Sequence, residues 1–294
     1  MRSLHRPLVR LATVLALLHP LAAMAQEPPA PALRGRDVGS SLNAPDAPLQ
    51  VRPIAEVGML AVVAHSYQGG RDGTLFNLQR DGGQASAALT WRLSAELEIN
   101  KRHTVVLLYQ PIDLRTRATL TDDLRVNGLT FPSGTPMQFR YGFDFYRVSY
   151  LYNLLADSRH ELSVGGSLQL RVADIEFASL DGRLQRTNQN LGPVPILKVR
   201  GRYTFANNAF IGTEIDGIGI QFPSELGSVL GVFVDASVRA GFSPTQFLET
   251  FVNLRYVGGG ARGPGSKPLS PAFGDGYVDN FIHAMTLSVG FALK

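Results

Sequence analysis

Two histidines and a serine are the residues whose types could support catalysis. His65 and Ser66 are adjacent near the end of one expected strand, and His283 lies near the start of another. A serine becomes a nucleophile when an adjacent base takes its proton, so a fold that makes these strands neighbours would create a hydrolase site. We favour the plainer interpretation that these polar side chains lie at the rim of an apolar surface. A hydrolase is kept as an alternative.

Charged residues that alternate with apolar ones form a second candidate site. If the apolar rows face outward, the alternate rows face a lumen, where opposite charges should pair because an unpaired buried charge is costly. The expected lumen charges are Arg92, Glu96, Arg115, Arg140, Asp144, Arg171, Lys198, Arg200, Arg202, Glu214, Asp216, Asp235, Arg239 and Arg255, and the same rows hold Glu98, Asp113, Arg117, Arg147 and Glu249. The cationic excess at Lys198, Arg200 and Arg202 leaves a narrow, anion-preferring path as an alternative.

The sequence offers no pattern for a cofactor or a metal. The absence of cysteine from all 294 residues excludes disulfide scaffolds, cysteine zinc sites and thiol catalysis. No metal-ligand spacing is present. Gly165-Gly166 and Gly258-Gly259-Gly260 are not followed by the Lys/Ser-led helix of a phosphate loop, so they favour close approach of strands. We therefore expect a protein that is not an enzyme.

The elements that position these residues are expected to be β-strands. Leu89, Trp91 and Leu93 alternate with Thr90 and Arg92, which is the period of a strand. Such alternation predicts ten strands, at 54–66, 86–98, 103–120, 137–155, 160–178, 194–205, 209–220, 228–241, 246–260 and 278–293. Short connections alternate with longer ones at 67–85, 121–136, 179–193, 221–227 and 261–277.

Loop lengths that alternate in this way are typical of an antiparallel transmembrane β-barrel, with short periplasmic turns at one rim and longer extracellular loops at the other. We expect an all-β fold of about ten strands, with eight or twelve as alternatives. Within 137–155 the apolar row shifts phase, because Phe139 to Phe145 occupy odd positions and Val148 to Leu154 even ones. A β-bulge near Tyr146-Arg147 would restore the facing.

The N-terminus predicts export. Residues 1–25 combine Arg2, Arg6 and Arg10 with an apolar run and the small-x-small site Ala23-Met24-Ala25, which is typical of a signal peptide. Removing three arginines lowers the formal charge from +4 to +1, so no nucleic-acid partner is expected.

The remaining chain divides into two parts. Residues 26–53 are rich in Pro and Ala and are expected to form an extended periplasmic tail. Residues 54–294 are expected to form the barrel. A mean hydropathy near zero excludes a polytopic helical membrane protein.

The chain resembles Gram-negative outer-membrane β-barrel proteins over nearly all of its expected mature length. The resemblance is carried by the leader, by the expected hairpin from 146–150 to 160–165, and by the closing strand. It implies outer-membrane lipids and the barrel-assembly machinery as partners, and both termini in the periplasm. The assembly signal would be the row Phe281, Met285, Leu287, Val289, Phe291 and Leu293, although Lys294 follows it and the last apolar residue is not aromatic.

The resemblance does not extend to the enzymes of this class. Neither an Asp-x-His motif, as in ten-stranded outer-membrane proteases, nor the His-x-Ser signature of lipid-deacylating barrels occurs. We expect a structural or surface-interacting barrel whose loops 67–85 and 261–277 meet partners and whose lumen is filled by paired charges.

Overall fold

The fold is all-β in the computed structural model, which describes residues 47–155, 159–224, 227–264 and 275–294. The expected signal peptide and residues 26–46 of the expected tail lie outside the described residues. The strands are β1 (Leu49–Gly69), β2 (Phe76–Asn77), β3 (Ala88–Ile99), β4 (His103–Gln110), β5 (Asp113–Thr119), β6 (Leu124–Val126), β7 (Leu129–Phe131), β8 (Pro136–Asn153), β9 (Glu161–Ser179), β10 (Gln185–Thr204), β11 (Ala209–Ser224), β12 (Gly227–Phe242), β13 (Leu248–Pro264) and β14 (Tyr277–Leu293). A search of these residues for helices of the length and apolarity needed to cross a membrane finds none.

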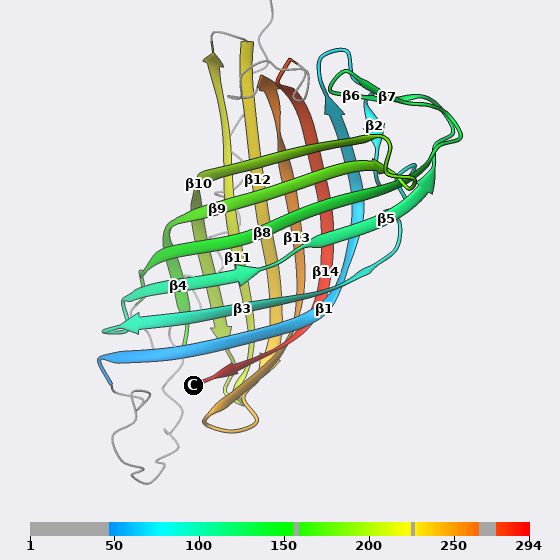
Figure 1. The fold of residues 1–294 in the computed structure, drawn as a ribbon. Coiled ribbons are helices and arrows are strands. Elements are labelled where there is room, and N and C mark those ends of the chain that lie inside the picture. The colour runs from blue at the N-terminus through cyan, green and yellow to red at the C-terminus, as the bar shows by residue number, and fades with distance from the viewer. Residues whose placement is uncertain (1–46, 156–158, 225–226, 265–274) are drawn as a thin grey trace, which may run out of the picture. The chain divides into compact units, whose positions relative to one another are not determined.

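The main sheet closes on itself as an antiparallel barrel (Figure 1). Around the ring, paired neighbours follow the order β1, β3, β4, β8, β9, β10, β11, β12, β13 and β14, and β14 pairs with β1 along a register that begins at Ile54–Ala292 and ends at Gly69–Val278. The short strands β4 and β5 both pair with β8 and together form one wall segment. The wall therefore has ten strands, as predicted, with both described chain ends at the same rim.

In the half of the barrel next to the short-turn rim, the two faces of the wall follow the predicted alternation. On β3, Leu89, Trp91 and Leu93 are exposed on the outer face, while Arg92 and Glu96 are buried inside. The same arrangement holds on β14, where the outward row includes Leu287, Val289 and Phe291. In this half of the barrel, apolar side chains thus lie outside and polar ones inside.

Strand β8 corrects the prediction of a bulge. Its register against β9 runs without a shift from Met137–Ser179 to Asn153–Ser163. Phe139, Phe145 and Arg147 consequently all point inward. From Asn153 toward Pro136, the inward side chains of β8 change from polar to apolar, and the outward side chains change from apolar to polar. We call the apolar part of the outer surface the apolar belt. The apolar row of β8 therefore changes phase where the strand leaves this belt.

The bulge lies on β1 instead. Its register against β14 shifts between Val62 and Ala64. β1 also starts at Leu49, so residues 49–53, which we expected in the tail, are part of the barrel. They pair with β3 alone, because the pairing with β14 begins only at Ile54. Pro53, which has no N–H to donate, is compatible with such an edge.

The connections at the long-loop rim are more ordered than expected. The expected loops 179–193 and 221–227 are mostly strand, because β9 and β10 remain paired up to Ala178–Gln185 and β11 and β12 up to Ser224–Gly227. The expected loop 67–85 contains β2, and Phe76 and Leu78 are buried in the interior. Residues 265–274 of the other expected partner loop lie outside the described residues.

Candidate functional site

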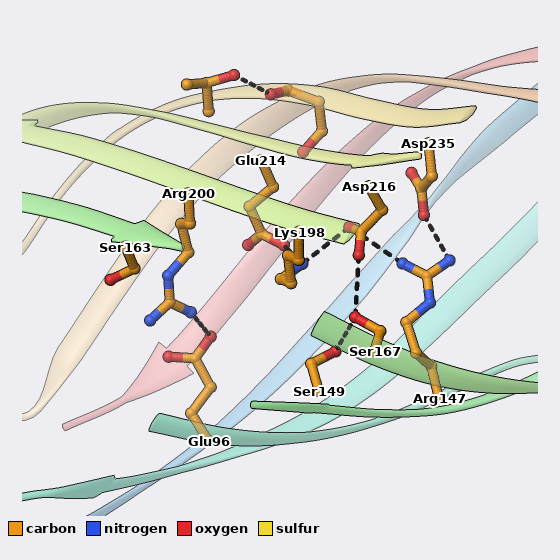
Figure 2. Close-up of polar contacts among 12 residues, drawn as sticks. Glu96, Arg147, Ser149, Ser163, Ser167, Lys198, Arg200, Glu214, Asp216 and Asp235 are labelled. Atoms are coloured by element: carbon orange, nitrogen blue, oxygen red, sulfur yellow. Dashed lines mark hydrogen bonds and ion pairs between the residues drawn. The ribbon is translucent and has the colours of Figure 1, made fainter. Parts of the chain in front are cut away.

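Paired charges fill the lumen from the short-turn rim to mid-barrel. Figure 2 shows side chains from opposite walls pointing toward one another. The network contains nine cations and seven carboxylates among the described residues, so most of their formal charges cancel. The cations are Arg52, Arg92, Arg147, Lys198, Arg200, Arg202, Arg239, Arg255 and Lys294, and the carboxylates are Glu56, Glu96, Glu161, Glu214, Asp216, Asp235 and Glu249.

Arg147 and Asp235 form the layer of this network that lies nearest the long-loop rim. The Arg147 Nη2 donates to Asp235 Oδ2 at 2.9 Å, and Arg147 Nη1 lies 3.2 Å from Asp216 Oδ2. Arg255 also donates two hydrogen bonds of 2.5 Å to Asp235. Since β8 and β12 are four positions apart in the ring, these contacts span the lumen.

Lys198, Arg200 and Arg202 do not form a free cationic strip. Lys198 Nζ donates to Glu214 at 2.8 Å and to Asp216 at 2.9 Å. Arg200 donates to Glu96 across the lumen at 2.8 Å and to Glu161 at 2.6 Å, while Arg202 forms two bonds with Glu249, at 2.6 Å and 3.0 Å. Every cation of the expected anion path therefore has a carboxylate partner.

Sequence reasoning missed Glu56 of β1, which is central to the network. It accepts hydrogen bonds from Arg239 at 3.1 Å, Asn253 at 2.8 Å and Ser288 at 3.0 Å. The signal was weak because the inward residues next to Glu56 are apolar, at Ile54, Gly58, Leu60 and Val62, so this part of β1 is apolar on both faces. A single acid within such a strand was the available clue.

Five charges of the expected lumen rows instead lie on the outer face. Asp113, Arg115 and Arg117 occupy outward positions of β5, and Arg140 and Asp144 occupy outward positions of β8, with 60% of the Arg115 side chain exposed. The side chain of Arg171 lies outside the described residues. Arg140 and Arg115 both bond Asp113 at 3.0 Å, beyond the apolar belt. Partial burial raises the pKa of Asp113, but these two guanidinium groups outweigh it and hold the pKa below its usual value.

The candidate catalytic residues are not brought together. His65 points into the barrel, is 1% exposed, and bonds Gln84 at 2.6 Å and Asn280 at 3.2 Å. His283 lies on the outer face and bonds the Tyr256 hydroxyl at 2.6 Å. The bulge on β1 turns His65 inward, and as a result the two imidazoles occupy opposite faces of the wall.

A packed apolar interior lies between the charge network and the long-loop rim. Phe139, Phe145 and Phe177 point inward from β8 and β9, and the hairpin β6–β7 contributes Leu124 and Phe131. All five are at most 2% exposed. The hairpin is held in place by a hydrogen bond of 2.8 Å from the backbone N–H of Asn127 to the carbonyl of Gly69. Apolar side chains therefore occupy much of the long-loop half of the lumen.

Metal binding finds no support in the part of the chain that the structure describes. No group of three or more His, Cys, Asp or Glu side chains there is arranged to hold an ion. The acidic side chains of the lumen are engaged by Arg and Lys instead.

Comparisons with known proteins give solved structures of low similarity and no family. No family model matches the sequence, and no curated protein is similar to it at a significant level. The outer membrane protease OmpT from Escherichia coli is 11% identical over 86% of this chain and 99% of its own, with a TM-score of 0.49. Ail, the attachment invasion locus protein of Yersinia pestis, is 10% identical over 82% and 98%, with a TM-score of 0.33. The Pseudomonas putida toluene transporter TodX is 9% identical over 86% and 91%, with a TM-score of 0.35. None of these activities is carried over to this chain.

Proposed function

We propose that the protein is an integral outer-membrane barrel with a closed lumen, acting in a structural or surface-interaction role. The observation that carries this proposal is the charge network, which spans the lumen between opposite walls beneath a packed apolar interior. Opposite charges that satisfy each other leave neither a hydrated path nor a free charged surface for ions.

The membrane location is supported by the inverted distribution of polarity. Large apolar side chains are exposed on every wall segment, including Val57, Leu93, Leu168, Ile215 and Leu254. A soluble monomer rarely exposes an apolar surface of this extent. Hydrocarbon offers no partner for backbone N–H and C=O groups, and a closed barrel satisfies them within its own ring.

The choice of membrane and orientation rests on the sequence. The signal-peptide pattern of residues 1–25 favours export, and the short-turn rim, which carries both described chain ends, is assigned to the periplasm. Outer-membrane lipids and the barrel-assembly machinery are the partners we propose. The outward row of β14 would provide the assembly signal.

Fractionation tests the location. We expect the chain to sediment with outer membranes and to change its gel mobility on heating, as folded barrels do. A mature chain that remains soluble without detergent would contradict the proposal.

Conductance tests the closed lumen. The refolded protein in a planar bilayer at high salt should give no discrete current steps. Regular steps with anion preference would instead support the alternative of a narrow channel. The hydrolase alternative gains no support, because the structure shows no contact among His65, Ser66 and His283.

A further inference from the structure

The barrel wall is incompletely paired between β10 and β11. Their register covers eight residue pairs, from Leu197–Gly217 to Thr204–Phe210. Each strand continues beyond this ladder, because β10 pairs with β9 to Gln185 and β11 pairs with β12 to Ser224. Figure 1 shows β10 diverging from β11 in the long-loop half of the barrel.

The sequence of β10 suits an open edge at this position. Pro193 and Pro195 have no N–H and therefore cannot donate to a sheet ladder. Proline within sheets is confined to edges, strand starts and bulges. The two prolines thus disfavour continuation of the β10–β11 ladder beyond Leu197.

A partly open cavity of about 190 Å³ lies at this edge. Its lining includes Pro193 and Val194 from β10 and Ile218 and Ile220 from β11, so both sides of the unpaired stretch contribute. Four aromatic side chains also line it, Tyr141, Phe143 and Phe145 from β8 and Phe233 from β12.

Gln169 links the cavity to the charge network. It lines the cavity, and its side-chain oxygen accepts hydrogen bonds from Arg147 at 2.9 Å and 2.7 Å. The cavity therefore ends where the paired charges begin.

The outer surface beside the unpaired stretch is also apolar. Leu170 and Val172 on β9 and Leu197 on β10 are exposed there. On β11, Ile220 and Phe222 share the inward row of Glu214 and Asp216 and are also exposed, so the inner side of this edge is apolar as well. In the proposed membrane location, the medium that meets this edge is hydrocarbon. An opening here joins an apolar cavity to the membrane interior.

We propose that this cavity binds the hydrocarbon end of an alkyl chain that enters from the membrane between β10 and β11. An apolar cavity of about 150 Å³ in another protein stays dry and binds benzene, so this one is large enough for the end of a chain. The rest of the chain would follow the unpaired edge into the bilayer. The inference rests on the proposed membrane location.

Spin-labelled lipids test the site in the full-length mature barrel. The protein is refolded in phosphatidylcholine vesicles with stearic acid that carries a nitroxide near its methyl end. Ala261→Phe fills the cavity from β13, and Ala240→Phe makes the same change on the lipid-facing side of β12. We expect immobilised stearate in the wild type and in Ala240→Phe, and binding weakened by at least about ten-fold in Ala261→Phe.

A second filling variant keeps the test valid if Ala261→Phe fails to fold. Gly231→Leu is suitable because a Cβ there would meet only Ile220 side-chain atoms, the nearest at 3.5 Å. Folding of each variant is checked by heat-dependent gel mobility.

The outcomes separate the site from the membrane location. Equal immobilisation of stearate in the wild type and in both folded filling variants would mean that only surface lipid is detected, and this would overturn the cavity site. Failure of the wild type to float with vesicles would instead overturn the proposed function. A second arm uses phosphatidylcholine with the nitroxide on one chain. Loss of binding in the filling variants with stearate alone would assign free fatty acids, and loss with both probes would assign membrane lipid chains.

Discussion

Arg147 on β8 and Asp235 on β12 are joined by a hydrogen bond of 2.9 Å across the lumen, between residues 88 positions apart in the chain. Both side chains are buried, and Asp235 also neutralises Arg255. The pair links opposite walls of the barrel. It forms the boundary of the charge network on the side of the long-loop rim.

Asp235→Ala should destabilise the barrel by about 3–5 kcal/mol, because removing one partner of a buried ion pair leaves an uncompensated charge. Here Arg147 and Arg255 both lose a carboxylate. Urea unfolding of the refolded protein measures the change. The control is Asp181→Asn in the exposed pair with Arg183, which should cost at most about 1 kcal/mol. Similar losses in the two variants would contradict a structural role for the network.

The apolar interior should keep the lumen closed even when the charge network is weakened. We expect the double variant Glu96→Ala/Arg200→Ala, which removes one ion pair across the lumen, to remain silent in a planar bilayer. Phe139 and Phe177 still fill the long-loop half, where their rings pack 5.6 Å apart. Discrete current steps from this variant, with a silent wild type, would show that the charges alone provide the seal.

The inward orientation of the β8 aromatics gives a paired test on adjacent residues. Phe139→Ala should cost about 3–5 kcal/mol, because it leaves a cavity in a packed interior. Arg140→Ala should cost at most about 1 kcal/mol, because its ion pairs lie on the partly exposed outer face. Urea unfolding compares the two variants, and the reverse order would mean that β8 faces the other way.

Restoring backbone donors to β10 should narrow the entry between β10 and β11. Pro193→Val/Pro195→Val returns two N–H groups to the stretch beyond Leu197. We expect slower uptake of the spin-labelled stearic acid than in the wild type, followed by electron paramagnetic resonance over time. Pro53→Val, at the other rim, serves as the control. Faster or unchanged uptake in the β10 variant would place the entry elsewhere.

Alternation by itself identified the strands and most of the lumen charges. Along β3 and β14 one face stays apolar over the whole belt, so a period of two was enough to assign Arg92 and Glu96 to the interior. The pairing of Lys198 and Arg200 with carboxylates also followed from the cost of an unpaired charge, although their partners could not be named.

The sequence alone misassigned residues where the surroundings change along a strand. Phe139 and Arg140 lie beyond the apolar belt, where the interior is apolar and the outer face is polar. Alternation reports which residues share a face but not which face is the lumen. For this reason Arg115, Arg140 and Asp144 were assigned to the interior.

Features that depend on strand register could not be predicted from local sequence. The bulge between Val62 and Ala64 turns His65 inward, away from His283. No local pattern in the sequence of β1 predicts this bulge. The β10–β11 ladder ends at Leu197–Gly217 although both strands continue. The sequence determined a ring of strands that is apolar outside and charged inside, because alternation is a local property. Which side chains meet in the lumen, and where the wall opens, depend on contacts between residues distant in the chain.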